Sequence, residues 1–294
     1  MQRFTIKDFD KLFPNDDACL EWLKNYLYPD GIECPKCQRV TKHHRITTRK
    51  SYSCDVCGHH VHPTAGTVYH KSSTPLRFWF YAVYLMAQTR TGISAKQLER
   101  ELGVTYKTAW RVFTKIRKLM AEDIDPLSGQ IEADETYVGG KDRNRHASKR
   151  TNVGGRGSQG KTIVAGIVQR HGSIIAKVVP DASAKSLVPN ITTHVMPRST
   201  VFTDEWAGYS SLTRRGYRHE RVHHGQGVYV SGTASTNTIE SFWSLIKRGI
   251  DGVHHVVSSK YLQDYINAYA FRWNHRDDET PMFMTMLRRV EKTS

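Results

Sequence analysis

Two pairs of cysteines constrain this chain more than any other feature of its sequence. Cys34 and Cys37 are separated by two residues, sixteen residues follow, and Cys54 and Cys57 repeat the two-residue spacing. Each spacer lets one tight turn aim two thiolates at the same ion, so this pattern predicts a tetrahedral four-cysteine zinc site. Such a site has no open position for a substrate. We therefore expect one structural Zn²⁺.

The residues around the cysteines predict a zinc ribbon. The stretch from Arg45 to Ser53 has the pattern of two short strands joined by a turn. A disulfide scaffold is the alternative, which a reducing compartment disfavours. His59, His60 and His62 could replace a cysteine ligand, although four thiolates already complete the coordination shell. Cys19 lies outside the pattern and is expected to be a small buried residue of a preceding helix.

The chain is strongly basic, since 43 Lys and Arg against 28 Asp and Glu give its 294 residues a formal charge of +15. This excess predicts a polyanionic partner, and without an amphipathic anchor the favoured polyanion is nucleic acid. The longest apolar run, residues 76–87, contains Arg77 and is shorter than the ~20 residues that cross a bilayer. The first ten residues lack the apolar stretch of a secretory signal. We expect a cytoplasmic protein without a membrane span.

A helical region follows the ribbon. Apolar residues at helical spacing begin after Thr74-Pro75, a cap followed by proline at the first helical position. A short helix capped by Ser94 then ends at Gly103, and a longer helix opens at Thr105. This pattern predicts a DNA-binding helix-turn-helix, the alternative being a helical hairpin with a solvated basic face. The expected DNA contacts on the longer helix are Lys107, Arg111 and Lys115.

The sequence divides into three expected parts. Residues 1–73 hold a helix and the ribbon, residues 74–125 hold the helix-turn-helix, and residues 126–294 begin with strands after a Pro-Leu-Ser-Gly turn. In the third part we expect strands at 130–137, 162–170, 173–179 and 200–203, and helices at 184–193, 206–214 and from 236 onward.

A basic, glycine-rich insert separates the first two of these strands. Residues 141–161 contain seven Lys or Arg and one acid. Because such side chains neutralise phosphates, we expect the insert to grip DNA, the alternative being a solvated loop. Its expected DNA contacts are Lys141, Arg143, Arg145, Lys149 and Arg150.

Two acidic residues stand where the expected strands would bring them together. Strand alternation puts Asp134 on the same face as Glu132. Asp204 follows the strand at residues 200–203, at the carboxyl end where open sheets present functional groups. Taken singly, each of these acids is more often a surface charge, so the argument rests on the constellation.

A third acid lies on the expected helix near residue 240. At about 3.6 residues per turn, Asn237, Glu240, Ser244 and Lys247 share one polar face of this helix, and its other face is apolar. Carboxylates hold two Mg²⁺ ions ~3.5 to 4 Å apart in phosphoryl-transfer enzymes. Lys247 would point at the phosphate region of the DNA on which these ions act. The next residue, Arg248, is a further expected DNA contact.

Together these motifs resemble the DDE transposases of bacterial insertion sequences, in the subgroup with an N-terminal zinc ribbon that is often called ISXO-like. The resemblance covers most of the chain. The matching stretches are Ala65 to Val68, Pro75-Leu76, Trp79-Phe80, Ile131 to Lys141, Thr203 to Tyr209, Asn237 to Trp243, Lys247 to Gly249 and Tyr269 to Arg276.

The resemblance implies an α/β chain with a ribonuclease-H-like catalytic domain, a mixed sheet flanked by helices. It implies that Asp134, Asp204 and Glu240 bind two catalytic ions, Mg²⁺ or Mn²⁺. Some relatives carry Asn where others carry Glu, and Asn237 lies close enough to compete with Glu240 or to assist it. The implied protein is a nucleoid-associated transposase that binds terminal inverted repeats, cuts double-stranded DNA and joins the 3′ ends to target DNA, as a homo-oligomer.

Two other functions remain open. A transcription regulator would use the ribbon and the helix-turn-helix without catalysis, and it would not need the three acids to meet. A ribonuclease-H-like nuclease or resolvase would keep the acids and would join no DNA ends. The pairs His223-His224 and His254-His255 have no matching acid or cysteine spacing nearby, and we expect them to be polar loop residues.

Overall fold

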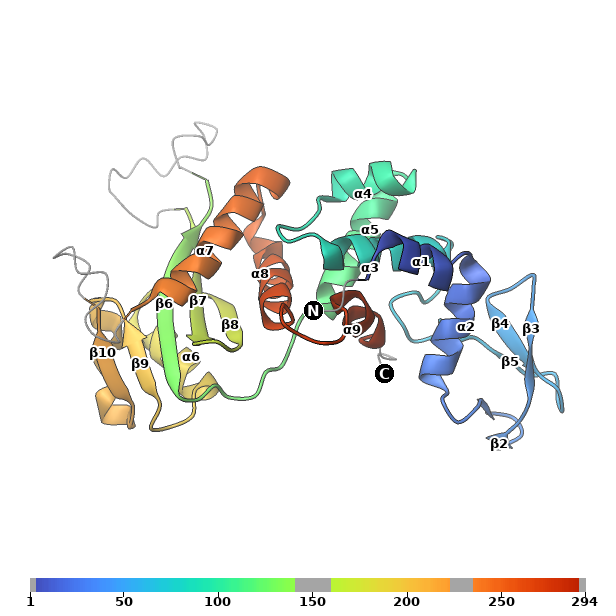
Figure 1. Ribbon diagram of the computed structural model, residues 1–294, viewed down its shortest axis with the longest axis horizontal. Helices are drawn as coiled ribbons and strands as arrows, with labels where there is room; N and C mark the ends of the chain where they lie inside the picture. The colour runs from blue at the N-terminus through green and yellow to red at the C-terminus, as the bar shows by residue number, and fades with distance from the viewer. Residues whose placement is uncertain (1–3, 141–159, 223–234, 291–294) are drawn as a thin grey trace. The chain divides into compact units, whose positions relative to one another are not determined.

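The structure is a computed structural model that describes residues 4–140, 160–222 and 235–290 (Figure 1). The chain forms two compact units. The ribbon unit comprises residues 1–89, 93–119 and 278–294, and the sheet unit comprises residues 90–92 and 120–277. The ribbon and the helices that follow it thus share one unit, to which the C-terminal residues return. No helix of the described residues is long and apolar enough to cross a membrane.

The ribbon is built from a two-stranded and a three-stranded antiparallel sheet. The sulfurs of its four cysteines all lie within 4.8 Å of one another, and Sγ–Sγ distances are 3.5 Å for Cys34–Cys57 and 3.9 Å for Cys37–Cys54. Zn–S bonds of ~2.3 Å in a tetrahedron separate the sulfurs by ~3.8 Å, so the geometry fits zinc. The strands are β1 (Glu33–Cys34), β2 (Arg39–Val40), β3 (His43–Ile46), β4 (Ser51–Cys54) and β5 (His60–Val61).

Two thiols of this cluster have pKa values that shift in opposite directions. The hydroxyl of Thr41 lies 3.2 Å from Sγ of Cys54, and this hydrogen bond is the main reason why the pKa of Cys54 falls to about 6. The pKa of Cys37 rises to about 12, chiefly through its hydrogen bond with Cys57. A divalent cation would favour the ionised form of both cysteines, because it is bound by thiolates. The histidines at positions 59, 60 and 62 do not belong to the cluster.

Aromatic side chains form the core between the helices of the ribbon unit. Phe13 packs against Phe80 and Phe283 with ring centroids 5.0 and 5.9 Å apart, and Phe9 lies 5.8 Å from Phe283. Phe283, near the C-terminal end of the chain, thereby packs in the same core as Phe9 and Phe13 near the N-terminal end. The helices are α1 (Ile6–Leu12), α2 (Asp16–Leu27), α3 (Leu76–Gln88), α4 (Ala95–Leu102), α5 (Tyr106–Leu119) and α9 (Met282–Arg288).

The cap of α3 differs from the expected one. The sequence predicts Thr74 as the cap, but the carboxylate of Asp16 accepts hydrogen bonds from the amides of Leu76 and Arg77 at 2.9 and 2.8 Å. Pro75 occupies the N-cap position and has no side-chain acceptor to offer. A carboxylate from another helix therefore satisfies the free amides and ties α2 to α3.

Helices α4 and α5 are joined by a tight turn, as expected. The hydroxyl of Ser94 accepts a hydrogen bond from the amide of Gln97 at 3.1 Å and caps α4. Gly103 ends α4 in the left-handed conformation, with φ of 61°, which favours glycine. Buried residues on the two facing sides, among them Leu98 and Phe113, hold the pair together.

The sheet unit contains a mixed five-stranded sheet with the order β10-β9-β6-β7-β8. Strands β6, β7 and β8 are antiparallel neighbours, whereas β9 runs parallel to β6 and β10 parallel to β9. The prediction of a mixed sheet is confirmed. The strands are β6 (Gln130–Val138), β7 (Thr162–Gln169), β8 (Ile174–Val179), β9 (Thr200–Thr203) and β10 (Arg218–Arg221).

Helices cover both faces of this sheet (Figure 1). On β7, Ala165 and Ile167 belong to the core beneath α6, whereas Val164 and Val168 belong to the core beneath α7 and α8. This alternation with a period of two is the reason why a strand buried on both faces reads as one continuous apolar run. The helices are α6 (Ala184–His194), α7 (Asn237–Gly249) and α8 (Ser259–Asn274).

One expected helix of the sheet unit is wrong. Residues 206–214 form two short 3₁₀ helices, η3 (Ala207–Tyr209) and η4 (Thr213–Arg215), where the sequence predicts one α-helix. The indole Nε1 of Trp206 donates to the carbonyl of Ala182 at 2.9 Å, and a Cβ on Gly208 would lie 2.7 Å from that nitrogen. This long-range contact holds the segment in its short turns.

Replacing Cys57 with Ser is expected to abolish zinc binding and to make residues 31–66 sensitive to protease, because a structural zinc site supplies folding free energy directly. The sheet unit, which contains none of the four ligands, should stay resistant. Metal analysis and limited proteolysis measure the two effects. Cys19→Ser, the same change at a buried cysteine outside the cluster, is the control and should retain one zinc per chain. Full zinc content in Cys57→Ser would contradict the four-cysteine site.

Candidate active site

Strands β6 and β9 bring two of the predicted acids side by side. Their parallel register pairs Ile131 with Val201 and Glu132 with Phe202. Asp134 lies two residues beyond the last pair of this register and Asp204 directly after the end of β9, close enough for the charge of Asp204 to act on the Asp134 carboxyl. Residues 70 positions apart in the sequence thus form a pair of like charges on neighbouring strands.

The carboxyl of Asp134 has a strongly perturbed acidity. Its pKa is raised to about 7, first by burial and then by the negative charges of Glu135 and Asp204. A hydrogen bond of 3.0 Å from the indole Nε1 of Trp243 to Oδ2 acts in the opposite direction. Burial and like charges both disfavour the ionised form, and a bound cation would favour it.

Glu135 is a further acid beside this pair, and it is not among the three acids that the sequence predicts for the site. Burial, followed by the charge of Asp204, raises the pKa of its carboxyl. The hydroxyl of Tyr209, in η3, donates to Oε2 at 2.8 Å and opposes that rise. The only signal in the sequence is its position next to Asp134.

Helix α7 faces this region with the polar stripe that its periodicity predicts. Glu240, Ser244 and Lys247 are exposed, whereas Ile239 and Phe242 are fully buried. The stripe borders a cavity of about 670 Å³. The cavity is lined by Asp134, Glu135, Thr136, Glu240, Trp243, Ser244, Lys247, Arg248 and Asp251.

The three predicted acids are only partly assembled. Asp134 and Glu240 line the same cavity, whereas Asp204 lies beside Asp134 and accepts a hydrogen bond from the amide of Trp206 at 3.0 Å. Among the described residues, the cysteine cluster is the only group of three or more metal-binding side chains within 4.8 Å of one another. The hydroxyl of Thr236 donates to Glu240 at 2.9 Å, and Asn237 is exposed at the first residue of α7.

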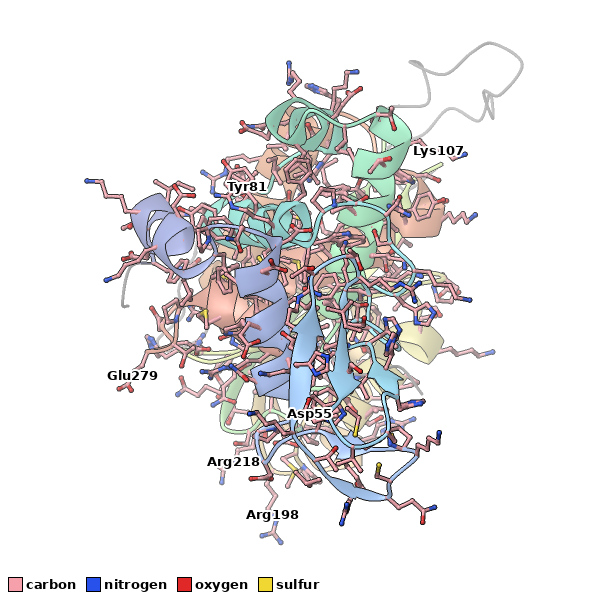
Figure 2. The ribbon with its side chains drawn as sticks, turned by 90° about the vertical axis from the view of Figure 1, so that its right-hand side faces the viewer. Asp55, Tyr81, Lys107, Arg198, Arg218 and Glu279 are labelled. Carbon is pink, nitrogen blue, oxygen red and sulfur yellow. The ribbon has the colours of Figure 1, made fainter. Side chains whose placement is uncertain are left out.

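The predicted DNA contacts fall into different environments. Lys247 and Arg248 are exposed on the cavity, and Lys141, Arg143, Arg145, Lys149 and Arg150 lie outside the described residues. Figure 2 shows Lys107 at the margin of the ribbon unit, pointing away from it. Arg111 instead donates to Oγ1 of Thr74 at 2.8 Å, and Lys115 donates to the carbonyl of Val68 at 3.3 Å.

Of the two histidine pairs, only His254-His255 lies in the described part of the chain, and neither of its residues lines the cavity. His223-His224 lies outside the described residues. The ring of His254 packs against Tyr265 at 4.7 Å, and Nδ1 of His255 lies 3.1 Å from the carbonyl oxygen of Asp251.

Sequence comparison identifies two domains in this chain. Residues 126–274 match the ISXO2-like transposase domain, and residues 14–60 match the transposase zinc-ribbon domain. The chain belongs to the ISXO2-like transposase family. It is a DNA transposase with an N-terminal zinc ribbon, as the resemblance predicts.

Two relatives of the transposase match it over different shares of its length. A protein of the transposable element ISH50 from Halobacterium salinarum is 30% identical over 277 residues, which cover 89% of this chain and 92% of the relative. A transposase-like protein from Haemophilus influenzae is 26% identical over 100 residues, which cover 34% of this chain and 80% of that protein.

Two solved structures are similar to the transposase at a low level. One is a chain of a simian T-cell lymphotropic virus intasome bound to a PP2A regulatory subunit, with a TM-score of 0.32, 14% identity, and coverage of 64% of this chain and 66% of that chain. The other belongs to the Mos1 strand transfer complex, with a TM-score of 0.29, 11% identity, and coverage of 73% and 75%. The family assignment rests on sequence alone.

Replacing Asp134 with Asn is expected to stabilise the sheet unit of the transposase at pH 8 by about 1–3 kcal/mol, because a pKa difference of one unit corresponds to about 1.4 kcal/mol. Asn keeps an acceptor for the Trp243 indole. The folded-state pKa of about 7 lies above the ordinary value of 3.8, so the carboxylate destabilises the fold above pH 7. The gain should shrink as the pH falls from 7 to about 4, because the folded chain takes up its proton near pH 7 and the unfolded chain only near pH 4.

Pulse proteolysis in urea, without added Mg²⁺ or Mn²⁺ and without chelator, measures this effect while the ribbon keeps its zinc. Glu220→Gln removes an exposed carboxylate from β10 and is the control, for which we expect no change with pH. An Asp134→Asn variant that is less stable than the parent at pH 8 would show that the buried charge is already compensated.

Proposed function

We propose that this transposase binds the terminal inverted repeats of an insertion sequence, cleaves the DNA and joins its 3′ ends to target DNA by two-metal phosphoryl transfer. The observation that carries the proposal is the pair Asp134 and Asp204 on neighbouring parallel strands, together with Glu240 on the cavity that Asp134 lines. The raised pKa of Asp134 supports a cation site, since a cation would offset the repulsion between these acids.

A ribonuclease-H-like fold is part of this proposal. The sheet has three antiparallel strands, and the two later strands run parallel to the first of them. The proposed acids come from β6, from the end of β9 and from α7. This order of strands and acids supports the fold that the family resemblance implies.

The donor set fits Mg²⁺ or Mn²⁺, because hard cations prefer carboxylate oxygens. Asp134, Asp204 and Glu240 would hold two such ions, which supply charge stabilisation to the attacking and leaving oxygens of an in-line displacement at phosphorus. The indole of Trp243 orients the Asp134 carboxyl, and the hydroxyl of Thr236 orients Glu240.

The cationic side chains beside these acids would position DNA. Lys247 lies two turns after Glu240 on the same cavity, where its ammonium would neutralise a phosphate next to the scissile one. Arg248 would contact the DNA backbone next to that phosphate. A reaction of this type depends on positioning and charge neutralisation, and it needs no covalent protein nucleophile.

Recognition of the element ends is assigned to the ribbon unit. We infer that α4 and α5 act as a helix-turn-helix, with the first turns of α5 in the major groove, where recognition helices contact base edges. Exposed Lys107 in the first turn of α5 supports this role. Because an element has two ends, we propose that a homo-oligomer of the chain assembles on double-stranded DNA of the nucleoid in the cytoplasm.

Glu240→Gln tests the third acid. It keeps the shape of the side chain and removes the charge that would hold a cation, so cleavage and joining should fall by more than about 100-fold while DNA binding stays near normal. Asn237→Ala removes a neutral oxygen donor and should cost less than about 10-fold. A joining assay with labelled 3′ ends measures both variants and separates a transposase from a nuclease or resolvase, which would release ends without joining them.

The matched variants are Asp134→Asn and Asp204→Asn, which should lose as much activity as Glu240→Gln. Since the acids act as one site, a double variant should cost little beyond either single one. Efficient cleavage by Glu240→Gln together with inactivity of Asn237→Ala would move the third position to Asn237.

Lys107→Ala is expected to reduce the preference of the protein for element ends over random DNA, because the first turn of a recognition helix contacts bases. The slope of log affinity against log salt should become shallower by about 1. Lys118→Ala removes an exposed cation from the last turn of the same helix and is the matched control. It should weaken binding to both DNAs equally. Fluorescence anisotropy over a salt series measures these quantities.

Arg111→Ala should behave differently, because its guanidinium is hydrogen-bonded to Thr74. We expect faster proteolysis of residues 64–74 in this variant in addition to weaker DNA binding. Equal loss of selectivity in Lys107→Ala and Lys118→Ala would place base recognition outside the first turn of α5.

A further inference from the structure

Glu132, two residues before Asp134 on β6, is a buried acid that the proposed chemistry does not use. Its side chain is fully buried. Oε2 accepts hydrogen bonds from the backbone amides of Thr238 and Ile239 at 2.8 and 3.0 Å, and Oε1 accepts one from the Thr238 hydroxyl at 3.0 Å. These amides are in the first turn of α7, where helix amides lack partners within the helix. Glu132 thus caps α7 from a neighbouring strand, and its negative charge lies at the positive end of the helix dipole.

Arg170 completes this anchor from the end of β7. Its Nε donates to Oε1 of Glu132 at 2.9 Å. One terminal nitrogen donates to the carbonyl and the hydroxyl of Ser235 at 2.8 and 3.0 Å, and the guanidinium lies 4.2 Å from the ring centroid of Phe202. The ion pair therefore holds both the first turn of α7 and the residues that lead into it.

A second contact joins the same helix to the same strand. The indole of Trp243 donates to Asp134, and its ring lies over β7 where a Cβ on Gly166 would come within 2.5 Å of it. Residues 132 and 134 are separated by ~6.7 Å along a strand. The amides of residues 238–239 and residue 243 are separated by ~7 Å along a helix. Because these two spacings match, α7 is held along β6 at two points in one register.

We propose that Glu132 is a positioning residue of the transposase, which sets the register of α7 on β6 and thereby holds Glu240 on the cavity beside Asp134. Glu240 lies between the two contacts, one residue after Ile239 and three before Trp243. A helix displaced by one residue turns by ~100°, which would carry Glu240 away from the cavity. This inference rests on the proposed function of Glu240. It assigns Glu132 no contact with DNA or with the ions.

Glu132→Gln is the informative substitution. Gln keeps the length of the side chain but replaces one acceptor oxygen with an amide that donates, in a place where every observed partner is a donor. We expect the single-turnover cleavage rate to fall about 10- to 100-fold and the dissociation constant for DNA to change less than about 3-fold. Amides of residues 236–243 should exchange with deuterium at least about 10-fold faster.

Two further variants separate positioning from stability. Glu132→Gln leaves Arg170 as a buried cation without its carboxylate, whereas the double variant Glu132→Gln/Arg170→Met removes that cation too. Its melting temperature should therefore return toward that of the parent while its cleavage rate stays low. Glu122→Gln is the matched control, because Glu122 is a partly buried acid that pairs with His275 at 2.7 Å, after the end of α8 in the same unit. It should lose thermal stability and keep its cleavage rate.

The assay uses full-length zinc-loaded protein with Mn²⁺ and a supercoiled plasmid that carries the DNA flanking the coding region. Parent-like cleavage by Glu132→Gln would overturn the proposal, as would a cleavage rate that recovers with the melting temperature in the double variant. Equal rate loss in Glu122→Gln would also overturn it. If the parent cut no DNA, the proposed function would fail, and amide exchange of residues 236–243 would still decide whether Glu132 holds α7.

Discussion

Three carboxylates of one strand, fully buried at Glu132 and partly buried at Asp134 and Glu135, are the constraint on which the sheet unit depends. Glu132, Asp134 and Glu135 all lie in β6, and a buried carboxylate costs several kcal/mol unless other groups satisfy it. The donors come from two elements: helix α7 supplies its first turn to Glu132 and Trp243 to Asp134, and η3 supplies Tyr209 to Glu135. The acids therefore determine where the helix and the 3₁₀ segment lie against the sheet.

These acids differ in how well hydrogen-bond donors compensate their charge. This difference distinguishes an acid with a structural role from one with the proposed metal-binding role. Glu132 receives three donors from the first turn of α7 and one from an arginine. Asp134 receives the Trp243 indole and a backbone amide, which do not offset burial and two neighbouring charges, so its pKa rises to about 7. A group whose charge is left under-compensated is suited to bind a cation, whereas a fully compensated one is suited to hold a helix.

Local patterns in the sequence predict much of this structure, and long-range contacts account for the rest. The ribbon, strands β6 to β9 and the polar face of α7 follow from cysteine spacing and periodicity, because those signals depend only on nearby residues, whereas β10 is not among the expected strands. The cap by Asp16 and the ion pair of Glu132 with Arg170 join residues 60 and 38 positions apart, so no local pattern reports them. The expected helix at 206–214 fails for the same reason, since Trp206 is held by a distant carbonyl.

The cavity is acidic, in contrast to the net positive charge of the whole chain. Four acidic and two basic side chains line the cavity, although the whole chain carries a formal charge of +15. Such a surface repels a phosphodiester unless cations lie between the two, so the cavity by itself cannot supply affinity for DNA. That affinity has to come from lysines and arginines elsewhere on the chain, whose effect is screened by salt. In the proposed function, DNA binding and catalysis are thus assigned to surfaces of opposite charge, and for this reason we expect a substitution at an acid to remove one activity and leave the other.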